Sequence, residues 1–418
     1  MDEKQDWSRR KTAIRLWLKG LGSARILSIV SRSRAWLSKW KARYRQYGWK
    51  GLRSRSRKPH HGSHAYPSAV RRLIERAYRR VQKRRWGLRG LAAIRRELRV
   101  TYRLRRLPSV STIRRVLRAA GVFVKRRRPT KTAVVYPQPR PTATYTIQSM
   151  DWTERFLHGG TKVYVFHTID LNTRACAQTI VPNKTAQSVM AHLQKVWKTR
   201  GIPQGLQLDN DAAFYGSRRV PHHFGQIVRL CLYVGVEPIF IPVGEAKRNG
   251  DVEQLHGVWD TAVWQQVQFN TVQAAQDFTP QFERWYMHEY EPPKLKGQTP
   301  HAAERGRPRR RLTPSLWQAL PAQLPIVAGR IHFIRRVSEA GTLEVLNEHW
   351  RVSKRLAGNY VWATLWTHRH RLEVFHRRSA DSPLKRIKIF PYGIDEPVEP
   401  LIPEFKPSSR RRKMFTMS

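Results

Sequence analysis

Three acidic residues stand at positions suited to chemistry, in a chain that has 80 Lys and Arg residues against only 29 Asp and Glu. Asp151 follows a strand-like run over 143–150, and Asp209 follows a short apolar strand over 205–208. Glu253 lies in the first turn of a helix that opens after an Asn-Gly pair. Carboxylates at the ends of separate elements can converge, and their oxygens are the ligands that hard divalent cations prefer. The pattern therefore predicts a metal site.

Phosphodiester chemistry with two Mg²⁺ ions is the reaction that such a site suits. Two ions about 4 Å apart can activate a water or a 3′-OH and stabilise the leaving oxygen. We expect Asp151 to bridge both ions, and Asp209 and Glu253 each to complete one of them. A first-turn helical side chain points back toward the helix N-terminus, which suits Glu253. Taken singly, a carboxylate that ends a strand is more often a solvated cap, so the interpretation depends on all three together.

The distribution of charge favours DNA as the partner. The formal net charge is +51, and residues 1–130 hold 40 Lys and Arg against 5 acids, whereas residues 145–300 hold 15 against 14. Basic flanks around a nearly neutral middle are expected of DNA-binding arms around a reaction centre. No long apolar run or amphipathic anchor indicates a membrane partner, and two cysteines give neither a disulfide framework nor metal-ligand spacing. We expect a cytoplasmic, nucleoid-associated protein.

Two helical domains are expected before the catalytic region. Residues 8–58 predict three short helices, the last capped by Ser33, in a helix-turn-helix pattern. Residues 67–123 repeat that pattern, with Ser109 or Ser111 as the last cap. A basic helical bundle that only coats phosphates is the alternative. The side chains off the apolar stripes, expected to contact DNA, are Arg34, Ser38, Lys39, Arg43, Arg114, Arg115 and Arg118.

The middle of the chain switches to strands. A basic, Pro-rich linker over 124–142 precedes a strand meander and then alternating helices and strands over 143–305, which predicts a mixed α/β sheet with helices on its faces. Short alternating strands over 328–378 predict a small β-barrel, followed by a basic tail over 379–418. Lys247 and Arg248, just before the helix of Glu253, are expected to contact scissile-strand phosphates, with a solvated loop as the alternative.

The residues around the three acids resemble the retroviral-integrase-type catalytic core of bacterial insertion-sequence DDE transposases. The segments that carry the resemblance are Met150–Thr153, Leu208–Asn210 with Phe214, Asn249–Glu253 with His256, and Gly297–Glu304. Residues 18–59 also resemble the N-terminal helix-turn-helix of that family, and the predicted barrel is similar to those appended to many such enzymes. The resemblance covers roughly residues 10–305.

The resemblance implies an RNase H-like fold, a catalytic triad of Asp151, Asp209 and Glu253, and Mg²⁺ with Mn²⁺ as a substitute. It also implies cleavage and joining of transposon ends to target DNA, by a homo-oligomer on DNA. Some positions depart from the family pattern. Asp211 stands where a Gly is usual and Ala213 where an acid is usual. The zinc domain of retroviral integrases is absent, and the helical arms take its place.

Other acids compete for the site. The family usually has about 35 residues between its second and third acids. Counted from Asp209, that spacing falls on Glu245, whereas 43 residues separate Asp209 from Glu253. We favour Glu253 because it opens a helix in the family's sequence context, and Glu245 then contacts DNA or gates the site. Asp211 is a rival metal ligand, and Asp170 is expected to be structural. The alternative functions are a DNA-binding protein without activity, including a decayed transposase, and a structure-specific nuclease of the same fold.

Overall fold

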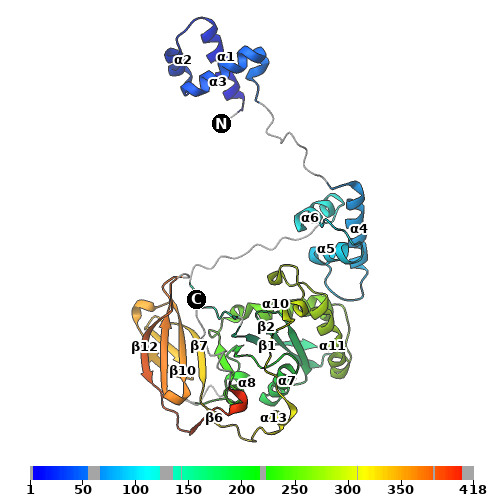
Figure 1. Ribbon diagram of the computed structural model, residues 1–418, viewed down its shortest axis with the longest axis vertical. Helices are drawn as coiled ribbons and strands as arrows, with labels where there is room; N and C mark the ends of the chain where they lie inside the picture. Colours follow the sequence, from blue (N-terminus) through cyan, green and yellow to red (C-terminus); the bar gives the residue numbers. More distant parts are fainter. Residues whose placement is uncertain are drawn as a thin grey trace. The chain divides into compact units, whose positions relative to one another are not determined.

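The computed structural model describes residues 3–54, 66–122, 135–142, 144–216, 223–307, 309–379 and 382–406. The chain divides into two compact units, Met1–Val70 and Arg71–Ser418 (Figure 1). Much of the predicted linker over 124–142, and the end of the predicted tail over 379–418, lie outside the described residues. None of the described helices is long and apolar enough to cross a membrane.

The first unit has the three helices that a helix-turn-helix requires. They are α1 (Glu3–Leu18), α2 (Ser23–Val30) and α3 (Arg34–Tyr47), followed by a short 3-10 turn, η1 (Gly48–Leu52). Ser33 caps α3 as predicted, because its hydroxyl accepts from the backbone N–H of Trp36 at 3.2 Å. Apolar side chains from all three helices, including Ile26 and Leu37, are buried between them.

A second set of three helices begins the rest of the chain. It comprises α4 (Ser68–Gln82), α5 (Leu91–Val100) and α6 (Val110–Ala119). Ser109 caps α6 by accepting from the N–H of Thr112 at 3.1 Å, which decides between the two predicted caps. Trp86 packs edge-on against Phe278 and Trp285 of α11 (Val272–His288), so this set contacts the α/β region directly.

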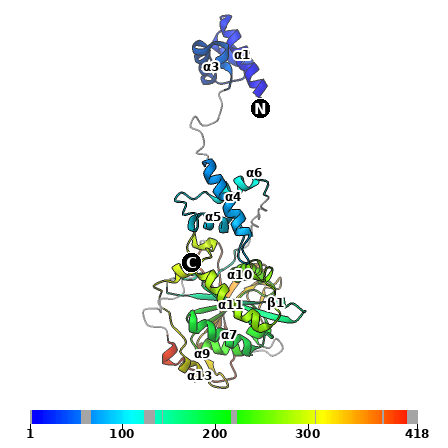
Figure 2. The same ribbon diagram turned by 90° about the vertical axis from the view of Figure 1, so that its right-hand side faces the viewer.

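The α/β region is a mixed sheet that carries helices on both faces. Its strands are β1 (Ile147–Phe156), β2 (Lys162–Asp170), β3 (Cys176–Val181), β4 (Gly205–Leu208) and β5 (Glu237–Phe240). β1 to β3 form an antiparallel meander, and β4 and β5 extend the sheet in parallel from β1. Helices α7 (Ala186–Thr199) and α9 (Gln226–Tyr233) pack on one face, and α10 (Gly250–Trp259) and α11 on the other (Figure 2).

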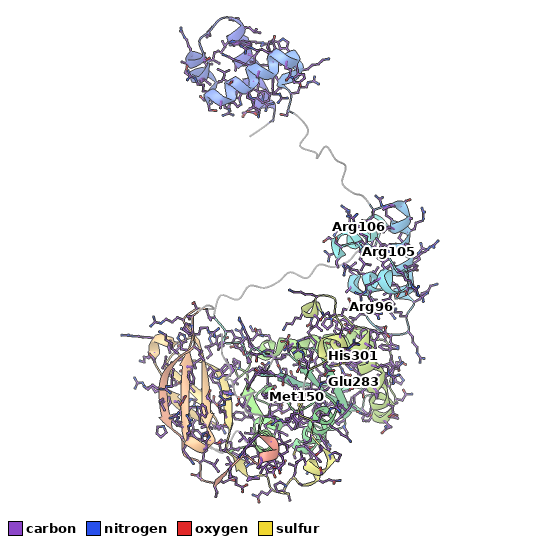
Figure 3. All side chains as sticks on the ribbon, in the orientation of Figure 1. Arg96, Arg105, Arg106, Met150, Glu283 and His301 are labelled. Carbon is purple, nitrogen blue, oxygen red and sulfur yellow. The ribbon has the colours of Figure 1, made fainter. Side chains whose placement is uncertain are left out.

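Alternation along β1 assigns its side chains to these two faces. Met150, labelled in Figure 3, is buried with α7, whereas Ile147 is buried with α10 and α11. Odd-numbered residues of β1 therefore face α10, because successive side chains of a strand point to opposite faces. In β4 the buried pair Leu206 and Leu208 faces α7, so its odd-numbered residues also face α10. The prediction that β1 ends at Asp151 was wrong, because pairing with β2 carries it to Phe156.

The C-terminal strands do not form the predicted barrel over 328–378. They are β6 (Ile326–Val327), β7 (Arg330–Arg336), β8 (Thr342–Val345), β9 (Glu348–Arg351), β10 (Tyr360–Trp366), β11 (Arg371–His376), β12 (Lys385–Pro391) and β13 (Val398–Glu399). β7 pairs in parallel with β5, through Ile239 with His332 and Phe240 with Phe333. Of the described strands, β7, β10, β11 and β12 thus join β1 to β5 in one open sheet, in the order β12-β11-β10-β7-β5-β4-β1-β2-β3, whereas β6 pairs with β13 and β8 with β9 in separate two-stranded sheets. The alternating pattern did not reveal that β7 would cover the edge of β5.

Candidate catalytic site

The register of two parallel strands makes Asp151 and Asp209 neighbours. β1 and β4 pair as far as Ser149 with Gln207, and each acid lies two residues beyond its member of that pair. Adjacent strands lie about 4.8 Å apart, and residues two apart share a face. Both acids therefore lie side by side at the carboxyl end of β4, on the face that α10 covers. Asp151 is in mid-strand and Asp209 just after a strand end, and both are half-buried.

A buried amide ties the start of α10 to both strands. Asn249 is fully buried in the short 3-10 turn η2 (Ala246–Asn249) that leads into α10. Its Oδ1 accepts from Gln207 Nε2 at 2.7 Å and from the hydroxyl of Ser149. Its Nδ2 donates to the carbonyl of Met150 at 3.3 Å. Because Glu253 lies one helical turn after Asn249, this clamp brings the start of its helix to the strands that carry the other two acids.

The charges of the three acids influence one another. Burial, together with the negative charges of Asp209 and Glu253, raises the pKa of Asp151 to about 7, although hydrogen bonds with the N–H of Trp152 at 2.8 Å and with Asn249 act in the opposite direction. Glu245 is not among the charges that act on this pKa. An excess of negative charge in a partly buried place is the condition that a divalent cation relieves, and carboxylate oxygens suit Mg²⁺ or Mn²⁺. Among the described residues, no group of three or more His, Cys, Asp or Glu side chains is arranged so that it could hold a metal ion.

Two buried histidines border the site without contributing positive charge. His167 pairs across the strands with Asp151, and its ring centroid lies 4.5 Å from that of His256 in α10. Burial lowers the pKa of His167 well below its usual value, and burial with the charge of Arg155 lowers that of His256 to about 3. Both imidazoles are therefore neutral at physiological pH, so they do not offset the carboxylates.

The competing acids have other partners. Asp211 caps the short helix α8 (Ala212–Tyr215), accepting from the N–H of Ala213 at 2.9 Å, and it pairs with Lys184 at 2.8 Å. Asp170 accepts from the N–H groups that close the turn after β2, in keeping with a structural role. Glu245 accepts from the hydroxyl of Tyr360 at 2.7 Å and pairs with Arg248 at 3.0 Å. Because Asp211, Asp170 and Glu245 are engaged in these contacts, we still favour Asp209 and Glu253 as the metal ligands.

The residues predicted to contact DNA fall into two groups. An exposed group consists of Arg34, Ser38, Lys39, Arg115, Arg118 and Lys247. A half-buried group consists of Arg43, Arg114 and Arg248. Arg43 lies over the ring of Trp40 at 4.6 Å and donates to the carbonyl of Arg53. Arg248 lies over the rings of Tyr136 and Tyr360 in addition to pairing with Glu245. Arg43 and Arg248 thus have intramolecular roles, and DNA contact by either group stays a prediction.

Sequence reasoning missed the residues that hold the acids in place. Ser149 and Gln207 are polar residues that each stand two places before an acid, and that pattern could have indicated a shared polar contact. The role of Asn249 had a weaker signal, the Asn-Gly pair at the start of a helix. Nothing local indicated the contacts of Tyr360 or Arg335, because they come from strands more than 100 residues away from their partners.

Comparisons with known proteins agree with this architecture. A family model described as "Integrase core domain" matches residues 141–246, about a quarter of the chain. No curated protein matches the sequence. Among solved structures, the chain is similar to the HTLV-2 integrase catalytic core domain in complex with magnesium, with 14% identity, a TM-score of 0.30 and coverage of 40% of this chain and 97% of that one.

Two further structures are similar at the same level. The simian T-cell lymphotropic virus intasome, in complex with a PP2A regulatory subunit, gives 13% identity and a TM-score of 0.34 over 75% of this chain and 96% of that one. The catalytic core domain of BIV integrase gives 19% identity and a TM-score of 0.27 over 37% and 91%. The family match over 141–246, together with the mixed sheet described above, confirms the predicted RNase H-like mixed α/β core: this part of the chain matches the integrase core domain model.

Proposed function

We propose that this protein is a DDE transposase that binds transposon ends and catalyses Mg²⁺-dependent DNA cleavage and strand transfer. The observation that carries the proposal is the strand register that makes Asp151 and Asp209 neighbours within the match to the integrase core domain. Glu253, in helix α10 just beyond that match, is close enough for its charge to act on Asp151. Its basic helical segments, with 40 Lys and Arg in residues 1–130, supply the affinity for a polyanion.

Each acid has a distinct part in this proposal. Asp151 would hold both metal ions, Asp209 one and Glu253 the other. When bound, two Mg²⁺ ions supply activation of a water or 3′-OH and stabilisation of the leaving oxygen. Burial and the neighbouring carboxylates raise the pKa of Asp151 to about 7, so a bound cation would favour its ionised form. The clamp at Asn249 keeps the helix of Glu253 against the strands.

We assign DNA binding to exposed polar and basic side chains on α3, on α6 and in the turn before α10. Arg34, Ser38 and Lys39 on α3, and Arg115 and Arg118 on α6, are exposed and free to approach a groove or phosphates. Lys247 is exposed in the turn before α10, the helix that carries Glu253. Coordinated joining of two ends calls for a homo-oligomer on DNA, and we propose a cytoplasmic, nucleoid-associated protein of bacterial insertion-sequence origin.

Strand transfer by the full chain on labelled transposon-end DNA with Mg²⁺ tests the proposal. Asp209→Asn should lower the rate at least about a hundredfold, since it removes a ligand charge. Asp211→Asn is the matched control, because Asn also caps helices well and should keep activity within a few fold. Activity that survives Asp209→Asn would overturn the assignment.

Other outcomes separate the alternatives. DNA binding without any chemistry in the wild-type chain would indicate a binding protein or a decayed transposase. Hydrolysis without joining of a 3′-OH to target DNA would indicate a structure-specific nuclease of the same fold. Mg²⁺-dependent joining that Mn²⁺ also supports is the result that we expect.

A further inference from the structure

A buried arginine from the C-terminal strands contacts the turn that carries Asp209. Arg335 of β7 is only 4% exposed. Its Nη2 donates to Asn210 Oδ1 at 2.9 Å, and its Nη1 donates to the carbonyl of Ile241 at 3.0 Å. Asn210 Nδ2 donates to that same carbonyl at 2.7 Å. The guanidinium, the amide and the carbonyl therefore form a closed triangle that joins the turns after β4 and β5 to β7.

The choice of arginine at this position is not explained by packing. Further hydrogen bonds go to the carbonyls of Glu344 at 2.8 Å and Ile334 at 3.0 Å and join it to the hydroxyl of Tyr215. These partners are neutral oxygens, although the carboxylate of Glu344 acts on the guanidinium through its charge, and burying a cation among neutral acceptors is unfavourable. An apolar side chain of similar volume would stabilise a sheet interior at least as well. The planar fork of a guanidinium, which can satisfy several acceptors at fixed angles, is what the site uses.

We propose that Arg335 is a positioning residue for the carboxylate of Asp209, acting through Asn210. Asp209 directly precedes Asn210, and its Oδ1 accepts from the backbone N–H of Asp211 at 3.0 Å. The conformation of this turn therefore sets the direction of the carboxylate, and Arg335 fixes the turn at its centre. The inference rests on the proposed function, since it assigns Asp209 to the metal site. It also means that the strands beyond the integrase core match at 141–246 complete the active site.

Binding of Mn²⁺ to the full-length protein in the absence of DNA tests the inference. Electron paramagnetic resonance of free Mn²⁺ gives the affinity of the wild type and of Arg335→Lys, which keeps the charge and loses the fork. We expect Arg335→Lys to weaken Mn²⁺ binding about tenfold, the effect typical of residues that orient metal ligands. Arg336→Lys is the matched control, because Arg336 is the next residue of β7, is exposed, and donates to the carbonyl of Gly358. It should change the affinity by less than about twofold.

Urea unfolding of each variant shows whether it folds. If Arg335→Lys does not fold, Asn210→Ala decides, since it removes the amide of the triangle and keeps the arginine, and it should weaken Mn²⁺ binding to a similar extent. An unchanged Mn²⁺ affinity in a folded variant of either kind would overturn the role of Arg335 and leave the proposed function standing. Wild-type Mn²⁺ binding that is absent, or insensitive to Asp209→Asn, would instead overturn the proposed function.

Discussion

The cations of the helical segments differ from those of the α/β region in what surrounds them. On α3 and α6, Arg34, Lys39, Arg115 and Arg118 are exposed. In the α/β region, Arg174 is only 1% exposed and pairs with Asp251 at 2.9 Å, and Arg155 donates to the two carboxylate oxygens of Asp260 through its Nε and Nη2. The same residue type is thus exposed in one region, where we propose that it contacts DNA, and contributes to internal order in the other.

This difference indicates how the two regions should respond to solution conditions. Exposed cations act on a polyanion through long-range forces that salt screens, and they contribute little to the stability of their own domain. Buried ionised groups are screened much less, and their effects depend on protonation and on exact neighbours. Salt should therefore change DNA binding, whereas pH and substitution of buried polar groups should change the catalytic region.

Salt dependence of DNA binding has the largest expected effect. If six phosphates are contacted, affinity for end DNA should fall on the order of 10³-fold between 50 and 200 mM salt, because bound cations release condensed counterions. Fluorescence anisotropy at several salt concentrations measures the slope, and Arg34→Ala should reduce that slope by about one. Affinity that hardly changes with salt would contradict the division between exposed arms and an ordered core.

Loss of the buried clamp has the next largest expected effect. Asn249→Ala removes the acceptor of Gln207 Nε2 and the Ser149 hydroxyl, so the helix of Glu253 is no longer fixed to the strands. Strand transfer should slow by about 10- to 100-fold, with affinity for DNA unchanged. Ser149→Ala removes one of the three bonds and should have a smaller effect. Equal rates for the wild type and the Asn249→Ala protein would show that the clamp does not position the acids.

The pH dependence of stability has the smallest expected effect. Burial and the neighbouring carboxylates raise the pKa of Asp151 to about 7 from its usual 3.8. The folded protein thus binds this proton more tightly than the unfolded chain, so this contribution to stability is full below about pH 4 and is lost as pH rises through 7. Allowing for partial exposure to water, the loss is on the order of 2 kcal/mol.

Urea unfolding with EDTA at pH 5 and pH 8 measures this effect. Asp151→Asn should remove the decline in the free energy of unfolding that the wild type shows between the two pH values. Glu154→Gln is the control, because it changes an exposed acid of the same strand and should leave the decline in place. A decline that persists in the Asp151→Asn protein would place its origin elsewhere.

Local patterns predicted the helices, their caps and most strands, because these depend on neighbouring residues. Ser33 and Ser109 cap α3 and α6, and the β1 to β3 meander formed as expected. Two predictions failed where distant segments decide the structure. Pairing with β2 extends β1 beyond Asp151, and pairing with β5 places β7 in the core sheet instead of a separate barrel.

The three acids could also be predicted better from local sequence than the residues that hold them in place. Asp151, Asp209 and Glu253 could be selected from sequence, because acids are scarce in this chain and each stands next to a recognisable element. The contacts of Asn249 and Arg335 could not, since Asn249 reaches partners 42 and 99 residues away and Arg335 reaches a partner 125 residues away. A side chain that acts through tertiary contact leaves no periodic signal near its own position.

The pairing of β5 with β7 has a consequence for the order in which the protein is made. While a ribosome has synthesised the chain only through β5 (Glu237–Phe240), the outer backbone groups of that strand have no partner strand. Synthesis must continue by about 90 residues before β7 (Arg330–Arg336) emerges to pair with them and delivers its arginine to the turn after β4. The nascent polypeptide thus carries Asp209 before Arg335 is available to contact the turn that follows β4.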